Sequence, residues 1–295
     1  MRSSASKLVL LGGALIISFS PVLVKLAAVQ TLGPTAIGFW RTLIGSLFLF
    51  LLVVIQKQPI FLSGGAFRIA ALGGFLFFID LFCWHRSVIY AGAGMATILG
   101  NTQVFLTAVL SFLIFKERLT VKFMFACLTA FVGVILLVGL FSSDVHFTSG
   151  YIKGILFGLA TGLAYSGYIL CLKRGSTHHS QPNITVFVAW TSLFSTFFLG
   201  LMAAFEKAPF IVINFNAIAS VVGLGICVQG LAWLAITRAL PAVKTAQAGL
   251  ILLLQPTMAM VWGILFFTEQ LTSIQVVGAA ITLTAMYLGI RSSKR

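Results

Sequence analysis

Ten apolar segments follow one another along this chain of 295 residues, and they limit the possible folds more than any other feature. A helix needs about 20 apolar residues to cross the hydrocarbon core of a bilayer. Only 8% of the residues are charged, whereas a soluble domain carries about 25%. We therefore predict an all-α integral membrane protein with ten transmembrane helices, at 8–28, 36–55, 67–88, 93–115, 121–141, 150–171, 183–204, 216–238, 244–266 and 272–291.

The apolar segments lack the patterns of a membrane barrel, a metal site or a redox site. Runs such as "MFACLTAFVGVILLVGL" (124–140) do not alternate between polar and apolar residues, as barrel strands do. The four cysteines lie inside apolar segments and form no C-x-x-C pair. We expect them to be small buried side chains, and we expect no metal and no cofactor.

The net charge of +14 is explained by topology. If the amino terminus faces the cytoplasm and the segments alternate, 14 of the 19 basic residues lie on or near the cytoplasmic side. Short cytoplasmic loops of membrane proteins carry such an excess of lysine and arginine. We expect a multi-pass protein of the cell inner (plasma) membrane with both termini in the cytoplasm. The bilayer accounts for the charge, and we expect no nucleic-acid partner.

One hexapeptide is written twice. "FKERLT" at 115–120 returns as "FTEQLT" at 267–272, 152 positions later. We infer two repeats of five helices, at 1–145 and 146–295. Because five is odd, the second repeat has inverted topology, as in many secondary transporters. The lysine and arginine of the first copy are missing from the second. This difference is expected if the first copy faces the cytoplasm and the second faces the opposite side, because basic residues are enriched on the cytoplasmic side.

The two copies predict a helix-connecting turn rather than a catalytic pair of acids. Thr120 and Thr272 precede apolar runs and are typical N-caps. Glu117 and Glu269 lie just before them, near a helix N-terminus, which favours a carboxylate. We assign these four residues a structural role in the turn.

The repeats extend beyond the hexapeptide. The first half contains "HRSVIYAGAGMATILGNTQVFLTAVLSFLIFKERLT", and the second contains "LAWLAITRALPAVKTAQAGLILLLQPTMAMVWGILFFTEQLT". Both resemble the drug/metabolite transporter (DMT) superfamily, in its EamA-type permease branch. Gln255-Pro256 matches that family's amide-or-acid plus proline site, and Arg41 matches an arginine often found in its second helix. Gln103-Val104 departs from the pattern. The resemblance implies two inverted five-helix repeats around a cavity that opens alternately to each side.

Asp80 is the only acid inside a predicted span. An intramembrane acid is costly and is by default a candidate for function. It could bind a substrate ammonium group or carry a proton, with Trp84 on the same helix face. The alternative is a buried structural pair with Lys25 or Arg41. We expect His85, near the outer helix end, to be a solvated interfacial residue.

Amides and aromatic residues in the central helices are the other candidates. Amides in hydrocarbon need partners, so they face another helix or a wet cavity. Aromatic walls suit aromatic, apolar or cationic ligands. The alternatives are interhelix hydrogen bonding for the amides and an interfacial belt for the tryptophans. The predicted substrate-binding residues, with Asp80, are Trp84, Asn101, Gln103, Tyr165, Tyr168, Gln229, Trp233, Gln247 and Gln255.

Two further features predict helix geometry. Gly154, Gly158 and Gly162 recur every four residues, which allows another helix to approach closely. Pro21 and Pro256 lie inside predicted spans and are expected bending points, because proline removes a helix hydrogen bond.

We predict a secondary-active transporter, not an enzyme, for a small organic metabolite. The resemblance favours an amino acid or related compound as the cargo, exported by alternating access with proton coupling or exchange. The alternative that the resemblance leaves open is uptake or antiport of a larger cationic or nucleoside-like metabolite such as S-adenosylmethionine. A lipid-modifying enzyme is a remote alternative, because no second acid accompanies Asp80 in the membrane. A monomer or homodimer is expected.

Overall fold

Each of the ten predicted spans contains helical residues in its described part. The computed structural model describes residues 3–28, 32–92, 96, 99–117, 119–138, 148–177, 183–207, 214–267 and 272–292, and no strand occurs among them. The elements are α1 (Ser3–Ile17), α2 (Ser20–Ala28), α3 (Pro34–Ile55), α4 (Gly64–Ala91), α6 (Gln103–Phe115), α7 (Val121–Val138), α8 (Ser149–Ser176), α9 (Ile184–Phe205), α10 (Phe215–Gly223), the π-helix η1 (Leu224–Ala232), α11 (Trp233–Ala239), the 3₁₀-helix η2 (Leu240–Ala242), α12 (Thr245–Ile251), α13 (Leu254–Phe267) and α14 (Ser273–Ser292).

Seven helical stretches in the described part of the chain are long and apolar enough to cross a membrane. They are 5–27, 34–55, 64–91, 149–176, 184–205, 215–242 and 245–267. Three shorter apolar helices lie at 103–115, 121–133 and 276–289. Each of these stretches overlaps one predicted segment, so the chain is a multi-pass membrane protein.

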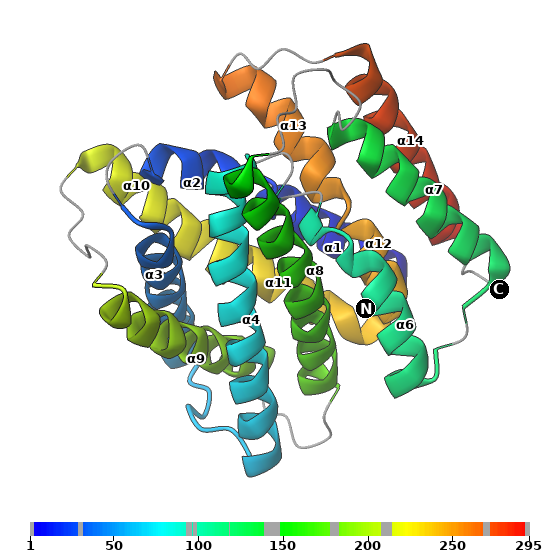
Figure 1. Ribbon diagram of the computed structural model, residues 1–295. Coiled ribbons are helices and arrows are strands. Elements are labelled where there is room, and N and C mark those ends of the chain that lie inside the picture. Colours follow the sequence, from blue (N-terminus) through cyan, green and yellow to red (C-terminus); the bar gives the residue numbers. More distant parts are fainter. Residues whose placement is uncertain are drawn as a thin grey trace.

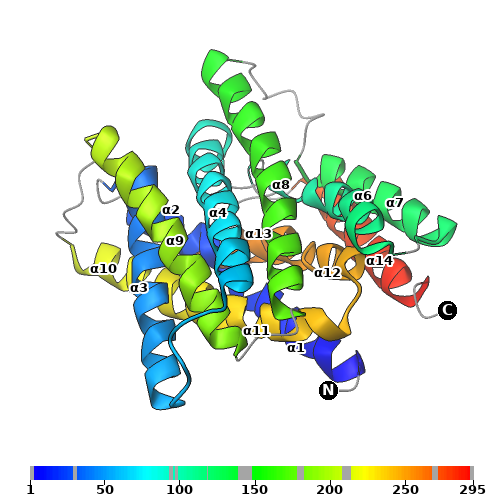
Figure 2. The same ribbon diagram turned by 90° about the horizontal axis from the view of Figure 1, so that it is seen from below.

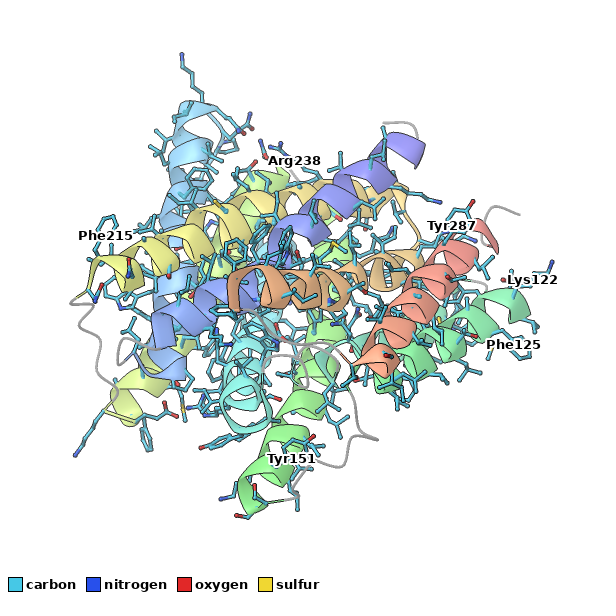
Figure 3. The ribbon with its side chains drawn as sticks, turned by 90° about the horizontal axis from the view of Figure 1, so that it is seen from above. Lys122, Phe125, Tyr151, Phe215, Arg238 and Tyr287 are labelled. Carbon is cyan, nitrogen blue, oxygen red and sulfur yellow. The ribbon has the colours of Figure 1, made fainter. Side chains whose placement is uncertain are left out.

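Apolar side chains cover the outside of the bundle. Phe125 of α7 is 66% exposed and Tyr287 of α14 is 56% exposed. Both lie at the edge of the bundle and point away from it (Figure 3). Such side chains are suited to contact with lipid, because the hydrocarbon core is as apolar as they are.

Proline explains two interruptions in the spans. The first span is broken between α1 and α2, and the ninth is broken between α12 and α13. A proline has no N–H for the carbonyl four residues earlier, and its ring clashes with that carbonyl. For Pro21 that carbonyl belongs to Ile17, and for Pro256 it belongs to Leu252, where the two breaks begin. The predicted bending at both prolines is confirmed.

The glycine stripe of α8 brings that helix close to α4. An ideal Cβ at Gly154 would lie 2.6 Å from the Cβ of Ala91. One at Gly158 would lie 2.9 Å from the Oγ of Ser87, also on α4. The Ser87 hydroxyl of α4 donates a hydrogen bond to the Gly154 carbonyl at 2.7 Å. The predicted packing role is therefore confirmed.

Segments at matching positions of the two halves pack against each other. Helix α3 contacts α9, α6 contacts α12, and α7 contacts α14. Figures 1 and 2 both show α7 and α14 side by side at one edge of the bundle. Helices α4 and α8 contact each other and α9, so residues of both halves meet at the centre.

The first of the two predicted turns does more than connect its neighbours. Thr120 caps α7, because its hydroxyl oxygen accepts a hydrogen bond from the Phe123 N–H at 3.2 Å. The Glu117 carboxylate reaches the start of α12, where it accepts from the Thr245 N–H at 2.9 Å and the Ala246 N–H at 3.3 Å. Glu117 therefore caps a helix of the other half, not the one that follows it.

The second turn is described only in part. Thr272 directly precedes α14, and its carbonyl accepts a hydrogen bond from the Val276 N–H at 3.2 Å. Glu269 lies outside the described residues, so its predicted role in the turn stays a prediction.

Candidate functional site

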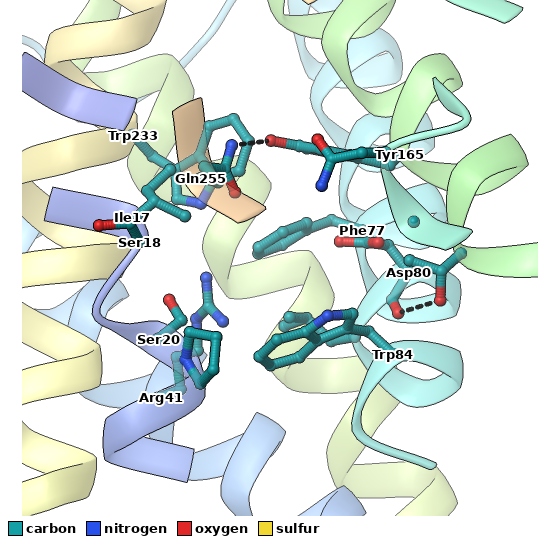
Figure 4. Close-up of a pocket in the computed structure, with 15 residues that line it drawn as sticks. Ile17, Ser18, Ser20, Arg41, Phe77, Asp80, Trp84, Tyr165, Trp233 and Gln255 are labelled. Atoms are coloured by element: carbon teal, nitrogen blue, oxygen red, sulfur yellow. Dashed lines mark hydrogen bonds between the residues drawn. The ribbon is translucent and has the colours of Figure 1, made fainter. Parts of the chain in front are cut away.

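A pocket lies at the centre of the bundle, beside the interrupted helices (Figure 4). It has about 520 Å³ of non-atom space, its open mouth included. Both halves of the chain contribute to its wall. The lining residues are Ile17, Ser18, Ser20, Pro21, Arg41, Phe77, Asp80, Leu81, Trp84, Gly100, Asn101, Thr161, Tyr165, Trp233 and Gln255.

Two side chains of opposite charge face this pocket. Asp80 of α4 is 7% exposed and Arg41 of α3 is 3% exposed. In Figure 4 they lie on opposite sides of the space, with Trp84 one helical turn beyond Asp80. The two groups are close enough to interact electrostatically. Within the described part of the chain they form no direct ion pair, and both line the same pocket.

Neither of the alternative structural partners, Lys25 and Arg41, forms an ion pair with Asp80 in the described part of the chain. Lys25 places its Nζ over the ring of Phe267, 4.0 Å from the centroid. The Arg41 guanidinium carbon lies 5.7 Å from the centroid of the Phe77 ring. The hydrogen bond drawn at Asp80 in Figure 4 ends on its backbone carbonyl, which accepts from the Thr161 hydroxyl at 3.5 Å. The carboxylate itself accepts none from another described residue.

Aromatic side chains form much of the remaining wall. The ring centroids of Trp233 and Tyr165 lie 5.8 Å apart and perpendicular, and those of Trp233 and Phe77 lie 5.6 Å apart. The Gln255 amide donates a hydrogen bond to the Tyr165 hydroxyl at 2.9 Å. This bond joins α13 to α8 across the pocket, directly beside the break that Pro256 causes.

The structure divides the predicted substrate-binding residues into two groups. Six of them line the pocket, namely Asp80, Trp84, Asn101, Tyr165, Trp233 and Gln255. The other four, Gln103, Tyr168, Gln229 and Gln247, do not belong to its wall. Their roles as ligand contacts therefore receive no geometric support, and packing explains most of them.

The amides away from the pocket join helices. The Gln103 amide donates to the Gly249 carbonyl at 3.2 Å and so links α6 to α12. The Gln229 amide donates to the Ser192 hydroxyl at 2.8 Å and links η1 to α9. Gln247 is 4% exposed within α12. Tyr168 is fully buried and stacks on Phe77, with centroids 4.3 Å apart.

His85 corrects one expectation. It is not a solvated interfacial residue, since it is only 1% exposed and its ring would lie 3.4 Å from a Cβ at Gly38. Arg41, which the sequence offered only as an alternative structural partner of Asp80, lines the pocket. Ser18, Ser20 and Thr161 were missed. The available signal for the two serines was Pro21, because helix breaks at membrane depth occur where the backbone lines a cavity.

The pocket wall offers several kinds of group that can bind a ligand. Among the described residues, no group of three His, Cys, Asp or Glu side chains could hold a metal ion. The wall combines one cation, one anion, hydroxyl and amide groups, and aromatic rings. This combination can bind and orient a small polar molecule.

A polytopic helical protein with such a pocket beside broken helices has the build of a membrane transporter. A family model agrees with this class, and it matches the chain twice, at 5–139 and 152–291. The chain belongs to the EamA-like transporter family, within the drug/metabolite transporter superfamily.

Several known proteins are similar over much of the chain. A probable amino-acid metabolite efflux pump of Salmonella typhimurium is 24% identical over 240 residues, 79% of this chain and 78% of that protein. A protein of Escherichia coli K12 with the same description is 24% identical over 67% of both chains. An uncharacterized transporter of Archaeoglobus fulgidus is 26% identical over 59% of both chains.

The fold has been seen before in a solved crystal structure. That structure superposes with a TM-score of 0.83 and covers 100% of this chain and 99% of the other. The two sequences are 16% identical, so the likeness concerns the fold alone.

Proposed function

We propose that this protein is a secondary-active carrier that exports a small organic metabolite, an amino acid or related compound, across the inner membrane by alternating access. The observation that carries this proposal is the central pocket, which lies beside helix breaks in both halves of the chain. In secondary transporters, substrate sites lie near the bilayer midplane where helices are discontinuous. The names of the relatives favour amino-acid compounds and export.

The proposed mechanism uses ten spans in two inverted repeats, 1–145 and 146–295. Two separate matches to one family model support a duplicated chain. The pairing of matching segments, α3 with α9 and α7 with α14, supports a pseudo-two-fold arrangement. Rocking one set of helices against the other around the pocket would expose it first to one side and then to the other.

Energy for transport would come from proton coupling or from exchange of one metabolite for another. Asp80 is the proposed coupling residue, because it is the described acid that faces the pocket. No G-x-x-x-x-G-K-[ST] motif for nucleotide hydrolysis is present in the sequence. The monomer or homodimer stays a prediction.

The alternative cargo is a larger cationic or nucleoside-like metabolite such as S-adenosylmethionine. The aromatic rings around the pocket favour such a cation. Arg41 can pair with the carboxylate of S-adenosylmethionine, but the additional positive charge of its sulfonium finds no second acid among the described lining residues. The enzyme alternative would need a catalytic cluster, and none is apparent among the described lining residues.

Counterflow in proteoliposomes tests the proposal. Vesicles preloaded with an unlabelled amino acid should take up the labelled compound faster than empty vesicles, because a loaded carrier returns its site more quickly. Empty and preloaded vesicles that fill at equal rates, across a panel of amino acids and S-adenosylmethionine, would contradict a carrier and indicate a channel or no transport.

Thiol labelling tests the inverted topology. In a chain without its native cysteines, the variant Lys207→Cys should react with a membrane-impermeant reagent from outside intact cells. Lys116→Cys should react only after the membrane is permeabilised. Equal labelling of both variants in intact cells would exclude the proposed arrangement of the two halves.

A further inference from the structure

The pocket holds two buried groups of opposite charge, Asp80 and Arg41, which form no ion pair with each other or with another described residue. A charge taken out of water is costly unless it is paired and hydrogen-bonded. Asp80 has no hydrogen-bond donor to its carboxylate among the described residues. The Nε of Arg41 is buried and has no acceptor there. Both side chains contribute to the pocket wall, so a molecule in the pocket could reach both.

Other charged side chains in the protein have ion-pair or hydrogen-bond partners. Arg86 forms an ion pair with Glu206 and also donates to the Thr35 hydroxyl at 2.9 Å. The Lys173 ammonium donates to the carbonyls of Leu240 at 2.6 Å and Val243 at 2.8 Å. The unsatisfied pair at the pocket is therefore a local feature and not a general property of the fold.

The two charged residues limit which ligands could bind without leaving Asp80 or Arg41 unpaired. A simple cation would neutralise Asp80 and leave Arg41 uncompensated, and a simple anion would do the reverse. Leaving one buried charge without a partner is strongly unfavourable. A ligand that carries both an ammonium and a carboxylate compensates both residues and adds no net charge.

The other residues of the pocket wall indicate what the ligand carries besides its ammonium and carboxylate groups. Between and around the charged groups stand Phe77, Trp84 and Trp233, with the aliphatic side chains of Ile17 and Leu81. Such a surface binds an apolar or aromatic group by burial of apolar area. A zwitterionic head with an apolar side chain would match the charged and the apolar parts of this wall.

We propose that Arg41 binds the carboxylate and Asp80 binds the ammonium group of a neutral α-amino acid with an apolar or aromatic side chain. The inference rests on the proposed carrier function and assigns its substrate class and orientation. The side chain of the ligand lies against Phe77, Trp84 and Trp233. The site rejects compounds that carry only one of the two charges.

Binding to the purified protein tests this assignment without transport. The unfolding midpoint is measured against concentration for alanine, leucine, methionine, phenylalanine and tryptophan, because a ligand of the folded state raises it. For each amino acid the matched amine lacks the carboxylate, and the matched carboxylic acid lacks the ammonium group. We expect at least one amino acid to bind roughly 30-fold more tightly than both of its analogues.

Two variants then assign each charge to its residue. In Arg41→Gln, the amino acid and its matched amine should bind equally, because the carboxylate has lost its partner. In Asp80→Asn, the amino acid and its matched acid should bind equally. Arg68→Gln removes an exposed charge at the other end of α4 and should leave all preferences unchanged.

The outcomes separate this inference from the carrier proposal. If no amino acid binds better than its analogues, or if each variant keeps the wild-type preference, the assignment is wrong. Counterflow driven by a simple cation would then still support a carrier. If the preferences are found but no amino acid accelerates exchange, the site is as assigned and the carrier proposal fails.

Discussion

Tyr165 and Tyr168 lie close together on α8, and their hydroxyl groups have different surroundings. The Tyr165 hydroxyl accepts the hydrogen bond of Gln255 at 2.9 Å. The Tyr168 hydroxyl is buried without a partner among the described residues. The sequence presents them as equivalent aromatic candidates, because neither residue type nor spacing reveals which hydroxyl meets an amide of another helix.

Removing each hydroxyl should therefore have a different effect. Tyr165→Phe breaks one hydrogen bond and should lower the free energy of unfolding by about 1 kcal/mol. It should also raise the half-saturation concentration for transport, because Gln255 loses the group that orients it in the pocket. Tyr168→Phe removes an unsatisfied polar atom and should leave stability unchanged or higher. Thermal unfolding in one detergent measures both, and equal losses would contradict this difference.

At the level of helices, the sequence predicted the breaks within a helix but not the contacts between helices. Pro21 and Pro256 predicted the two breaks because a proline acts on its own helix. The role of Glu117 could not be read in the same way. Its partners Thr245 and Ala246 lie 128 and 129 positions away, and only the packing of α6 beside α12 brings them together.

The contribution of the Glu117 cap on α12 to stability can be measured by substitution. Glu117→Gln keeps an oxygen acceptor but loses the charge that strengthens its hydrogen bonds to Thr245 and Ala246. We expect a loss of roughly 2 kcal/mol in unfolding free energy. The neighbouring Lys116 is exposed, so Lys116→Gln should change stability by less than about 0.5 kcal/mol. Similar small effects for both variants would show that the cap contributes little.

Replacing glycine by alanine at two positions should have different effects on the free energy of unfolding. An ideal Cβ at Gly158 lies 2.6 Å from Leu99 Cβ and 2.9 Å from Ser87 Oγ. Gly158→Ala should therefore cost about 1–3 kcal/mol through overpacking. A Cβ at Gly12 meets no other atom within 4 Å, so Gly12→Ala should be neutral or stabilise α1 by up to about 1 kcal/mol. Unfolding midpoints check both, and a stable Gly158→Ala variant would contradict the close packing of α8.

At the scale of the whole molecule, hydropathy predicted the helical membrane class and the positions of the helices. Hydropathy could not predict which of the polar residues line the pocket. Gln103 and Gln255 occupy matching positions of the two halves, yet Gln103 bonds the Gly249 carbonyl while Gln255 faces the pocket. Arg41 was seen as a partner for Asp80, because a sequence shows two opposite charges but not the space between them.

The central claim is that one pocket is reached from both sides of the membrane in turn. Ser20 lines that pocket and is 3% exposed. In a chain without its native cysteines, Ser20→Cys should react with a small impermeant thiol reagent in both right-side-out and inverted vesicles. Substrate should change the two rates in opposite directions, because it shifts the balance between the two states.

The control is Lys207→Cys, at a connection between helices, which should react from one side only. Labelling of Ser20→Cys from a single side under every condition would contradict alternating access. Equal changes of the two rates would also contradict it, since they would indicate a pore open to both sides at once.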